Sequence, residues 1–135
     1  MPLTRKVFTL GSCAEIDNTD VHACDSEKEL LLAFRDFFME ADPHVLTGYN
    51  ITGFDLPFLI QRAEILGDED FATFSQIKLR RVQINKNDKR VTKIAGRYIH
   101  DCYHCVLEYA KKNSNYTGSK KLDSAAKFFL NEGKE

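Results

Sequence analysis

The clearest pattern in the chain is a series of apolar residues at helical spacing between residues 26 and 66. One predicted helix face collects five of them, Leu30, Leu31, Phe34, Phe37 and Phe38. This helix should begin at Ser26, because Ser26 and Glu29 form a capping-box pattern, and it should end near Ala41. A second helix should stop at Gly67. Its apolar face collects Leu56, Leu59, Ile60, Ala63 and Leu66.

Shorter alternating or continuous apolar stretches predict strands. Residues 6–10 and 20–24 should pair as a hairpin, because residues 17–19 (Asp-Asn-Thr) supply turn chemistry between them. Residues 44–49 (HVLTGY) form a short apolar run that ends in turn residues, which is typical of a buried strand. A second hairpin should span residues 75–96, where two alternating segments flank a polar turn.

The last third of the chain predicts one more strand and two helices. The segment 96–112 passes from a strand into a helix whose N-cap is Asp101, with Cys105, Val106 and Tyr109 facing inward. A final helix covers residues 122–130. Its apolar residues are Ala125, Ala126, Phe129 and Leu130. The element order therefore predicts an α/β fold with a mixed sheet and flanking helices.

Length and charge limit the classes of protein to which the chain can belong. With 135 residues, 43% of them hydrophobic, the chain suits one domain with a single core. Its formal charge of -1 provides no overall positive field for nucleic acid, although a local basic face remains open. The longest apolar stretch falls short of the roughly 18 to 20 residues that cross a bilayer. We therefore expect a soluble, intracellular protein without a membrane partner.

The predicted second hairpin is the most basic part of the chain. Its cationic residues are Lys78, Arg80, Arg81, Lys86, Lys89, Arg90 and Lys93. Such charges commonly keep an exposed strand soluble and unpaired, and they also suit contact with a phosphate backbone. Composition favours the first interpretation and leaves the second open.

Four cysteines raise the question of a zinc or redox site. Cys102 and Cys105, with His100 and His104 nearby, resemble half of a zinc knuckle or a redox pair at a helix start. The other two cysteines are too far apart in sequence to complete a knuckle. The pattern favours ordinary half-buried thiols, and we expect no zinc site.

The stretch LTGYNITGFDLPFLIQRAEIL, residues 46–66, contains the strongest candidate chemistry. Asn50 and Asp55 follow a predicted strand at the edge where ligands collect in open α/β sheets. Asp55 suits two roles, as the N-cap of the second helix or as a metal ligand. Gly53 and Pro57 both fit a tight turn into a helix, so spacing alone favours the cap.

The stretch DPHVLTGYNITGFDLPFL closely resembles exonuclease motif II of the family B DNA polymerases. The matching residues are Gly48, Tyr49, Asn50, Phe54, Asp55, Pro57, Phe58 and Leu59. The segments VFTLGSC, GRYIHDCYHCVLEY and LDSAAKFFLNEGKE also resemble the flanking regions of delta-type and related viral members, in the same order. The resemblance thus spans nearly the whole chain.

This resemblance implies an RNase H-like 3'-to-5' exonuclease domain that proofreads DNA during replication. Two Mg²⁺ or Mn²⁺ ions would serve the reaction, with Asp55 as a catalytic carboxylate and metal ligand. Single-stranded DNA at a primer 3' end would meet Tyr49, Asn50 and Phe54. Asn50 could instead support the metal ligands, and for both aromatic residues the core is the favoured position. The phosphate backbone would meet four basic residues, Arg80, Arg81, Lys89 and Arg90. A polymerase of this kind would act in the nucleus if eukaryotic, or in a host cell if viral.

The chain also departs from the family pattern. No Asp-x-Glu pair precedes Lys6, and no Tyr and Asp helix follows the last residues, so only one of four expected metal carboxylates is present. The position of Asp101 opens a helix, and capping explains it. We therefore expect residues 1–135 to be a single partial domain that has little or no nuclease activity without the remainder of a polymerase chain. The alternative is a stand-alone, non-catalytic module that binds nucleic acid or a protein partner.

Overall fold

The computed structural model describes residues 4–131 as a mixed α/β structure. Its strands are β1 (Lys6–Leu10), β2 (Asp20–Cys24), β3 (Val45–Gly48), β4 (Gln83–Ile84), β5 (Val91–Lys93) and β6 (Tyr98–Asp101). Its helices are α1 (Glu27–Ala41), α2 (Asp55–Ile65), α3 (Cys102–Lys112) and α4 (Leu122–Leu130), with a 3-10 turn, η1, at Phe71–Thr73. The predicted domain limits, residues 1 and 135, lie outside the described residues.

Helix α1 forms where the sequence predicts it. The Ser26 hydroxyl accepts a hydrogen bond of 3.2 Å from the Glu29 N–H. The Glu29 carboxylate in turn accepts one of 2.9 Å from the Asp25 N–H, one residue earlier than a standard capping box. At the other end, Asp42 adopts a left-handed conformation and its N–H bonds back to Phe38. Local capping and the apolar face thus account for this helix.

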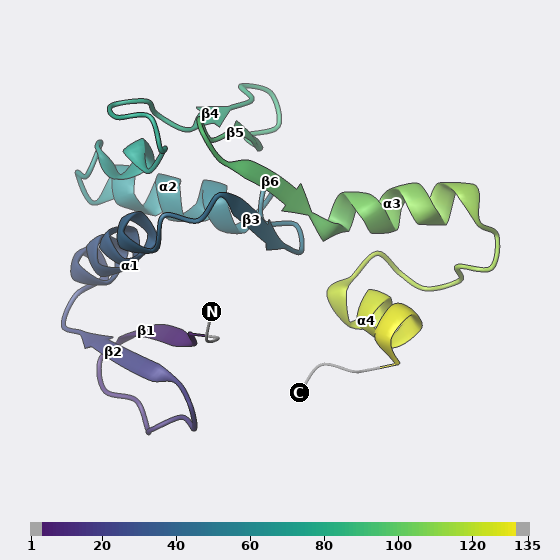
Figure 1. The fold of residues 1–135 in the computed structure, drawn as a ribbon, viewed down its shortest axis with the longest axis horizontal. Coiled ribbons are helices and arrows are strands. Elements are labelled where there is room, and N and C mark those ends of the chain that lie inside the picture. Colours follow the sequence, from purple (N-terminus) through teal and green to yellow (C-terminus); the bar gives the residue numbers. More distant parts are fainter. Residues whose placement is uncertain (1–3, 132–135) are drawn as a thin grey trace.

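Strands β1 and β2 run parallel, so the predicted hairpin is wrong. Lys6 lies beside Asp20 and Leu10 beside Cys24. The expected turn does form, because the Thr19 N–H bonds to the Ile16 carbonyl at 3.1 Å, but it lies within a loop that brings the chain back alongside the start of β1 (Figure 1). Turn residues fix a local bend, whereas strand direction depends on the length and path of the whole connection.

The described strands form three two-stranded sheets instead of the predicted single mixed sheet. Strands β1 and β2 pair parallel, β3 and β6 pair parallel, and β4 and β5 form an antiparallel hairpin. The hairpin is confirmed but much shorter than predicted, because residues 71–82 turn back on themselves. The Val82 N–H bonds to the Ala72 carbonyl, which takes this segment out of any ladder.

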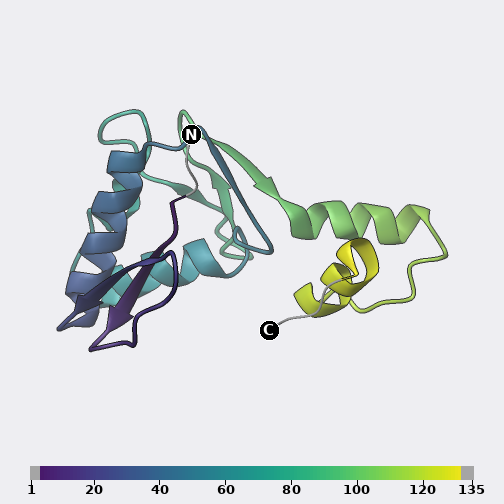
Figure 2. The same cartoon turned by 60° about the horizontal axis from the view of Figure 1, so that its bottom comes forward.

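Most buried side chains belong to one main core. Its members are Leu31, Phe38, Leu56, Ile60, Ala63, Phe71, Ala72, Phe74, Val82, Val91 and Ile94. They come from α1, α2, η1 and the segments around the β4–β5 hairpin. Figures 1 and 2 show α1, α2 and this hairpin gathered in one part of the molecule. The apolar stripes predicted for the first two helices therefore pack into the same core.

A buried arginine ties the edge of this core together. Arg97 donates a hydrogen bond of 3.1 Å to the Phe74 carbonyl and one of 2.6 Å to the Pro43 carbonyl. It also pairs with Asp42 at 2.9 Å and lies over the Phe38 ring. These contacts satisfy the guanidinium, whose burial would otherwise be costly.

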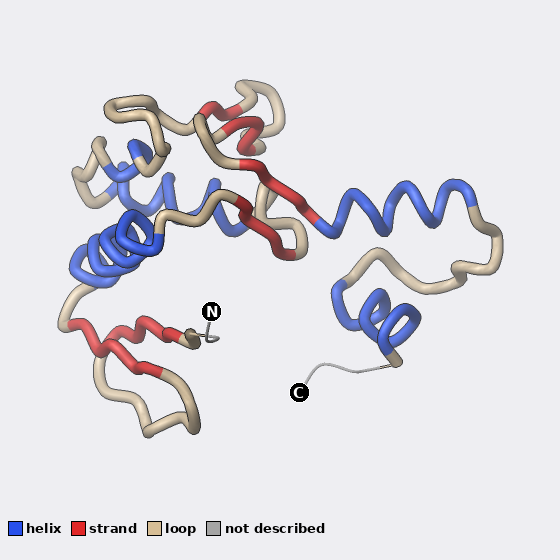
Figure 3. The backbone as a smooth tube through the Cα atoms, viewed as in Figure 1, coloured by secondary structure: helices blue, strands red, loops and turns tan. Residues whose placement is uncertain are grey.

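Helices α3 and α4 extend away from the main body and fold against each other (Figures 1 and 3). They enclose a second, smaller cluster formed by Val106, Tyr116 and Ala125. Helix α4 has the predicted limits, and Asp101 caps α3 as predicted. Cys105, however, is exposed, so its predicted inward position is wrong; the neighbouring Val106 takes the buried place. No helix in the described part of the chain is long and apolar enough to cross a membrane.

Candidate functional site

The motif loop, defined here as residues 49–54, joins β3 to α2. Asn50 adopts a left-handed conformation with φ 61°, and its carbonyl accepts hydrogen bonds from the N–H groups of Gly53 and Phe54. A Cβ atom at position 53 would lie 2.6 Å from the Asn50 Oδ1 and 2.7 Å from the Arg90 Nη2. The loop is thus a tight turn, and a side chain at position 53 would displace the Asn50 and Arg90 side chains that close over it.

Asp55 is the first residue of α2 and does not cap it. The N-cap position belongs to Phe54, and the first helical N–H groups are met by backbone, since Leu56 bonds to the Ile51 carbonyl and Phe58 to that of Phe54. The predicted capping role is therefore wrong, because the turn itself satisfies the donors that a cap would serve. Within residues 4–131 the exposed Asp55 carboxylate forms no hydrogen bond or ion pair.

A free carboxylate at this position is available to a cation from solvent. It lies at a helix N-terminus, where the backbone dipole favours negative charge. Oxygen ligands of this kind suit Mg²⁺ and Mn²⁺. Among the residues that the structure describes, no three His, Cys, Asp or Glu side chains converge on a single point. Asp55 is thus an exposed oxygen donor that belongs to no such group within residues 4–131.

Asp101 holds the motif loop from one side. Its Oδ1 accepts hydrogen bonds from the N–H of Asn50 at 2.7 Å and of Tyr103 at 3.1 Å. Its Oδ2 accepts from the Thr52 N–H at 3.1 Å and from the Thr52 hydroxyl at 2.7 Å. Burial alone would raise the pKa of Asp101, but these bonds outweigh it and hold the pKa below its ordinary value. Asp101 is therefore a buried, charged anchor.

The β4–β5 hairpin holds the loop from the other side. Arg90 donates a hydrogen bond of 3.2 Å from Nη2 to the Asn50 Oδ1, and its Nη1 lies 3.2 Å from the His104 Nε2. The Val91 N–H donates one of 2.8 Å to the Thr52 carbonyl. The structure thus brings together two predicted site residues, Asn50 and Arg90, that are 40 positions apart.

The two predicted aromatic contacts have different environments. Phe54 is 62% exposed and stacks on the exposed Phe58, with ring centroids 6.1 Å apart, so its alternative assignment to the core is wrong. It lies in the turn before α2, away from the buried stripe of that helix. Tyr49 is half-buried; its hydroxyl bonds to the Lys120 carbonyl at 2.7 Å and its ring meets Tyr103 edge-on. Tyr49 therefore connects the motif loop to the second cluster.

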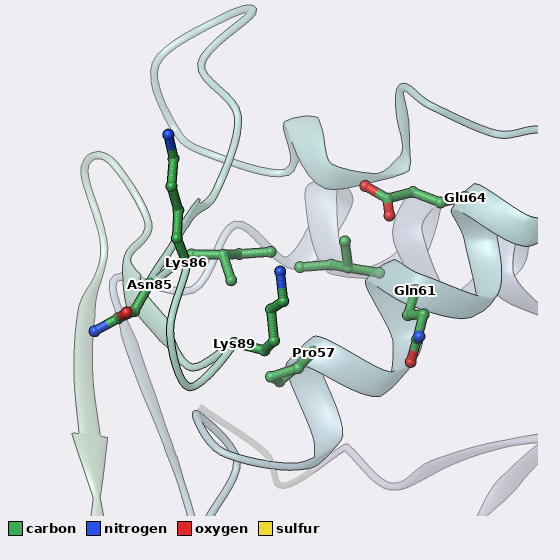
Figure 4. Close-up of a pocket in the computed structure, with 8 residues that line it drawn as sticks. Pro57, Gln61, Glu64, Asn85, Lys86 and Lys89 are labelled. Atoms are coloured by element: carbon green, nitrogen blue, oxygen red, sulfur yellow. The ribbon is translucent and has the colours of Figure 1, made fainter.

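The other three basic residues that were predicted to contact phosphate have no common partner. Arg81 pairs with Glu64 at 3.5 Å and also bonds to the Glu69 carbonyl, and Arg80 lies exposed beside it. Lys89 extends from the hairpin turn into a hollow of about 370 Å³ against α2 (Figure 4). The other labelled residues around this hollow are Pro57, Gln61, Glu64, Asn85 and Lys86. Arg90 thus lies near the start of α2, Arg81 near its end, and Lys89 along the helix between them.

Sequence reasoning missed that Thr52 and Asp101 belong to the site. Thr52 is 7% exposed, and nothing in its local pattern marks it. A signal for Asp101 was present, because it ends a strand just as Gly48 does, and the two lie side by side in the parallel pair of β3 and β6. Polar groups at adjacent strand ends are expected to meet.

The cysteines make only weak contacts. All four thiols are free. Cys102 lies 3.6 Å from the Thr47 hydroxyl, and Cys105 lies 3.7 Å from the His100 Nε2. These pairs involve different partners, so the half-knuckle pattern does not gather its residues at one point.

Comparison with known proteins assigns the chain to a family. A family model described as "DNA polymerase family B, exonuclease domain" matches residues 1–124. The DNA polymerase delta catalytic subunit of Arabidopsis thaliana is 38% identical to this chain, in an alignment that is 144 residues long and covers 99% of the chain. The corresponding subunits of Caenorhabditis elegans and Drosophila melanogaster are 36% and 34% identical over the same share. The chain spans 13% of the length of each of these relatives. It belongs to the family B DNA polymerases and matches the exonuclease domain of that family.

Proposed function

We propose that residues 1–135 form part of the 3'-to-5' proofreading exonuclease domain of a replicative DNA polymerase, with an RNase H-like fold. The observation that carries this proposal is the Asp55 carboxylate, which is exposed, has no hydrogen-bond or ion-pair partner within residues 4–131, and is fixed at the head of α2 by a tightly bonded turn. A carboxylate that serves neither as a cap nor in an ion pair is suited to bind a metal ion.

Asp55 would hold Mg²⁺ or Mn²⁺ as one of several ligands, and the remaining ligands would come from other parts of the polymerase. When bound, such metal ions would supply an activated water and would neutralise charge on the scissile phosphate. The contribution of this chain is to position one hard oxygen donor at the end of the motif loop. Because one carboxylate cannot hold two ions, we expect the isolated chain to release little or no nucleotide.

The surface next to Asp55 suits single-stranded DNA. Phe54 and Phe58 form an exposed stacked pair, and aromatic faces of this kind support unpaired bases at about 1–3 kcal/mol each. The Asn50 side chain lies on the same loop, with Arg90 bonded to it. Tyr49, the first residue of the same loop, would also contact the single strand. Contact with the phosphate backbone would fall to Arg80, Arg81, Lys89 and Arg90.

We also propose which partners the chain binds and where it acts. Its partners would be a primer 3' end and the remainder of the polymerase chain. In a eukaryote the site of action would be the nucleus, where replication takes place.

The decisive variant is Asp55→Ala in the polymerase that carries these residues. Release of nucleotides from a 3'-labelled single-stranded oligonucleotide in Mg²⁺ should fall by about 10²-fold or more, because a metal ligand is lost. Incorporation of nucleotides by the same enzyme should be unchanged. Asp36→Ala, which removes an exposed carboxylate from α1, should leave both activities intact. Unaltered nucleotide release by Asp55→Ala would refute the proposal.

The isolated chain provides a second test. Purified residues 1–135 should show no Mg²⁺-dependent nuclease activity above that of the Asp55→Ala chain. Activity that disappears with Asp55→Ala would show that the chain by itself completes a metal centre.

A further inference from the structure

We infer that Asp101 is a positioning residue for the exonuclease reaction, acting through the motif loop on Asp55. The inference rests on the proposed function, because it concerns the same site. Asp101 itself is not suited to bind metal, since both of its oxygens already accept two hydrogen bonds each. Its role is to hold the backbone that carries the metal-binding carboxylate.

The hydrogen bonds of Asp101 go beyond what a helix cap needs. Capping of α3 requires only the bond from the Tyr103 N–H. The other three bonds come from Asn50 and Thr52, which lie 51 and 49 residues earlier in the chain. Two of these three, at 2.7 Å each, are shorter than the capping bond at 3.1 Å. The carboxylate is therefore directed mainly at the motif loop.

The charge of Asp101 is held without a cationic side chain. The residue is 6% exposed, and within the described residues it forms no ion pair. Three backbone N–H groups and one hydroxyl stabilise the charge instead, with the N-terminus of α3 adding its dipole. Because β6 is paired with β3, Asp101 also lies beside Gly48, immediately before the loop. The anchor is thus fixed to the same pair of strands that delivers the loop.

The two loop residues bonded to Asp101, Asn50 and Thr52, position the start of α2. The Asn50 carbonyl accepts the N–H groups of Gly53 and Phe54, and the Ile51 carbonyl accepts that of Leu56. Fixing Asn50 and Thr52 therefore fixes the turn that ends at Asp55. Since the Asp55 side chain has no protein partner within residues 4–131, its position depends on this backbone alone. Displacement of a reacting group by about 1 Å can cost on the order of 10²-fold in rate.

Asp101→Asn in the polymerase tests this inference. The substitution keeps the shape of the side chain but replaces one carboxylate oxygen by an NH2 group, which faces the donors of Asn50 or Thr52. We expect kcat for nucleotide release from single-stranded DNA to fall by about 10- to 100-fold. The Mg²⁺ concentration for half-maximal rate should rise, and nucleotide incorporation should stay within about twofold. Ser26→Ala is the matched control, because it removes a helix cap outside the loop and should leave nucleotide release within about twofold.

Thr52 offers a milder pair of variants that does not remove the charge. Thr52→Val deletes only the hydroxyl that donates to the Asp101 Oδ2 and should lower nucleotide release less than Asp101→Asn does. Thr52→Ser restores this donor and should recover most of the rate. A merely structural defect would not follow the presence of this hydroxyl.

A measurement on the purified chain without metal provides a readout independent of activity. Amide hydrogen exchange of Asn50 or of Thr52 should accelerate about tenfold or more in Asp101→Asn, because the asparagine amide keeps one oxygen and so leaves one of the two N–H groups without its acceptor. The amide of Ile60, within α2, should keep its protection. Ser26→Ala should leave the exchange of Asn50 and Thr52 unchanged.

The outcomes separate this inference from the proposed function. If Asp55→Ala abolishes nucleotide release while Asp101→Asn matches Ser26→Ala, the inference is overturned and the proposed function stands. If Asp55→Ala retains full release, the proposed function itself fails. Unchanged exchange of Asn50 and Thr52 in Asp101→Asn would also overturn the inference, whatever the activity.

Discussion

The main body and the unit formed by α3 and α4 differ in how much apolar surface they bury. In the main body, eleven buried residues from several elements pack as one cluster. In the α3–α4 unit only Val106, Tyr116 and Ala125 are buried, while Phe128 and Phe129 are 40% and 44% exposed. Both regions contain helices with clear apolar stripes. A stripe therefore predicts the helix but not how completely its apolar face is covered.

The candidate site lies where these two regions join. Asp101 ends β6 and caps α3, so it belongs to both regions, and it holds the loop that begins α2. Tyr49 makes a second connection through its bond to Lys120. The main body thus supplies the buried packing beneath the site, and hydrogen bonds at the junction position the loop.

Removal of a ring from the main core should produce the largest loss of stability. Phe71 is 1% exposed, so Phe71→Ala should lower the free energy of unfolding of the chain by about 3–5 kcal/mol. Phe128→Ala is the matched control in the α3–α4 unit and should cost much less, because its ring is 40% exposed. Urea denaturation followed by circular dichroism measures both. Equal losses would mean that the two regions do not differ as described.

Removal of the central ring of the smaller cluster should unfold that unit locally. The Tyr116 ring packs on Phe128 and Phe129, and its hydroxyl bonds to the Ser119 carbonyl at 2.6 Å. Tyr116→Ala should cost about 2 kcal/mol, below the range for a ring in a large core. Amide exchange should accelerate across residues 122–130 and stay unchanged in α2. Tyr116→Phe, which keeps the ring, should cost about 1 kcal/mol. Accelerated exchange throughout α2 would instead indicate a single cooperative unit.

A substitution at the junction should change the free energy of unfolding least, and the change should depend on pH. Burial would raise the pKa of Asp101, but its hydrogen bonds hold that pKa below the ordinary 3.8. The stability that these bonds contribute is therefore fully present above about pH 4 and is lost as pH falls through the folded-state pKa. The difference in unfolding free energy between the chain and Asp101→Asn should shrink by on the order of 1 kcal/mol at low pH. Urea titrations at pH 6 and pH 2.5 measure it.

The matched control for the pH effect is Ser26→Ala, which has no titrating group at the altered position. Its difference from the unaltered chain should be the same at both pH values. A constant difference for Asp101→Asn would show that its carboxylate does not contribute through its charge.

Local features of the sequence predicted much of the fold. The limits of α1 follow from the Ser26 cap and the apolar spacing after it, and α4 begins and ends as expected. Asp101 was correctly predicted as the cap of α3. These features depend on residues within a few positions of one another, so a local pattern is sufficient to reveal them.

The errors concern how the backbone is arranged around a feature that the local sequence favours. Turn residues 17–19 predicted a hairpin, but the pairing of Lys6 with Asp20 is parallel. Capping spacing predicted a bond for Asp55, but the turn carbonyls of Ile51 and Phe54 already serve the helix start. In both cases a valid local preference was met by a different arrangement of the backbone.

The sequence by itself determined the helices, the motif around Asp55 and, through its resemblance, the family to which the chain belongs. Only the tertiary structure decided that the Asp55 carboxylate has no partner among the described residues, that Phe54 is exposed and that Asp101 reaches back to Asn50 and Thr52. The physical reason is that helix formation is governed by neighbours three and four positions apart. The loop, in contrast, is fixed by hydrogen bonds between residues about 50 positions apart, which no local pattern specifies.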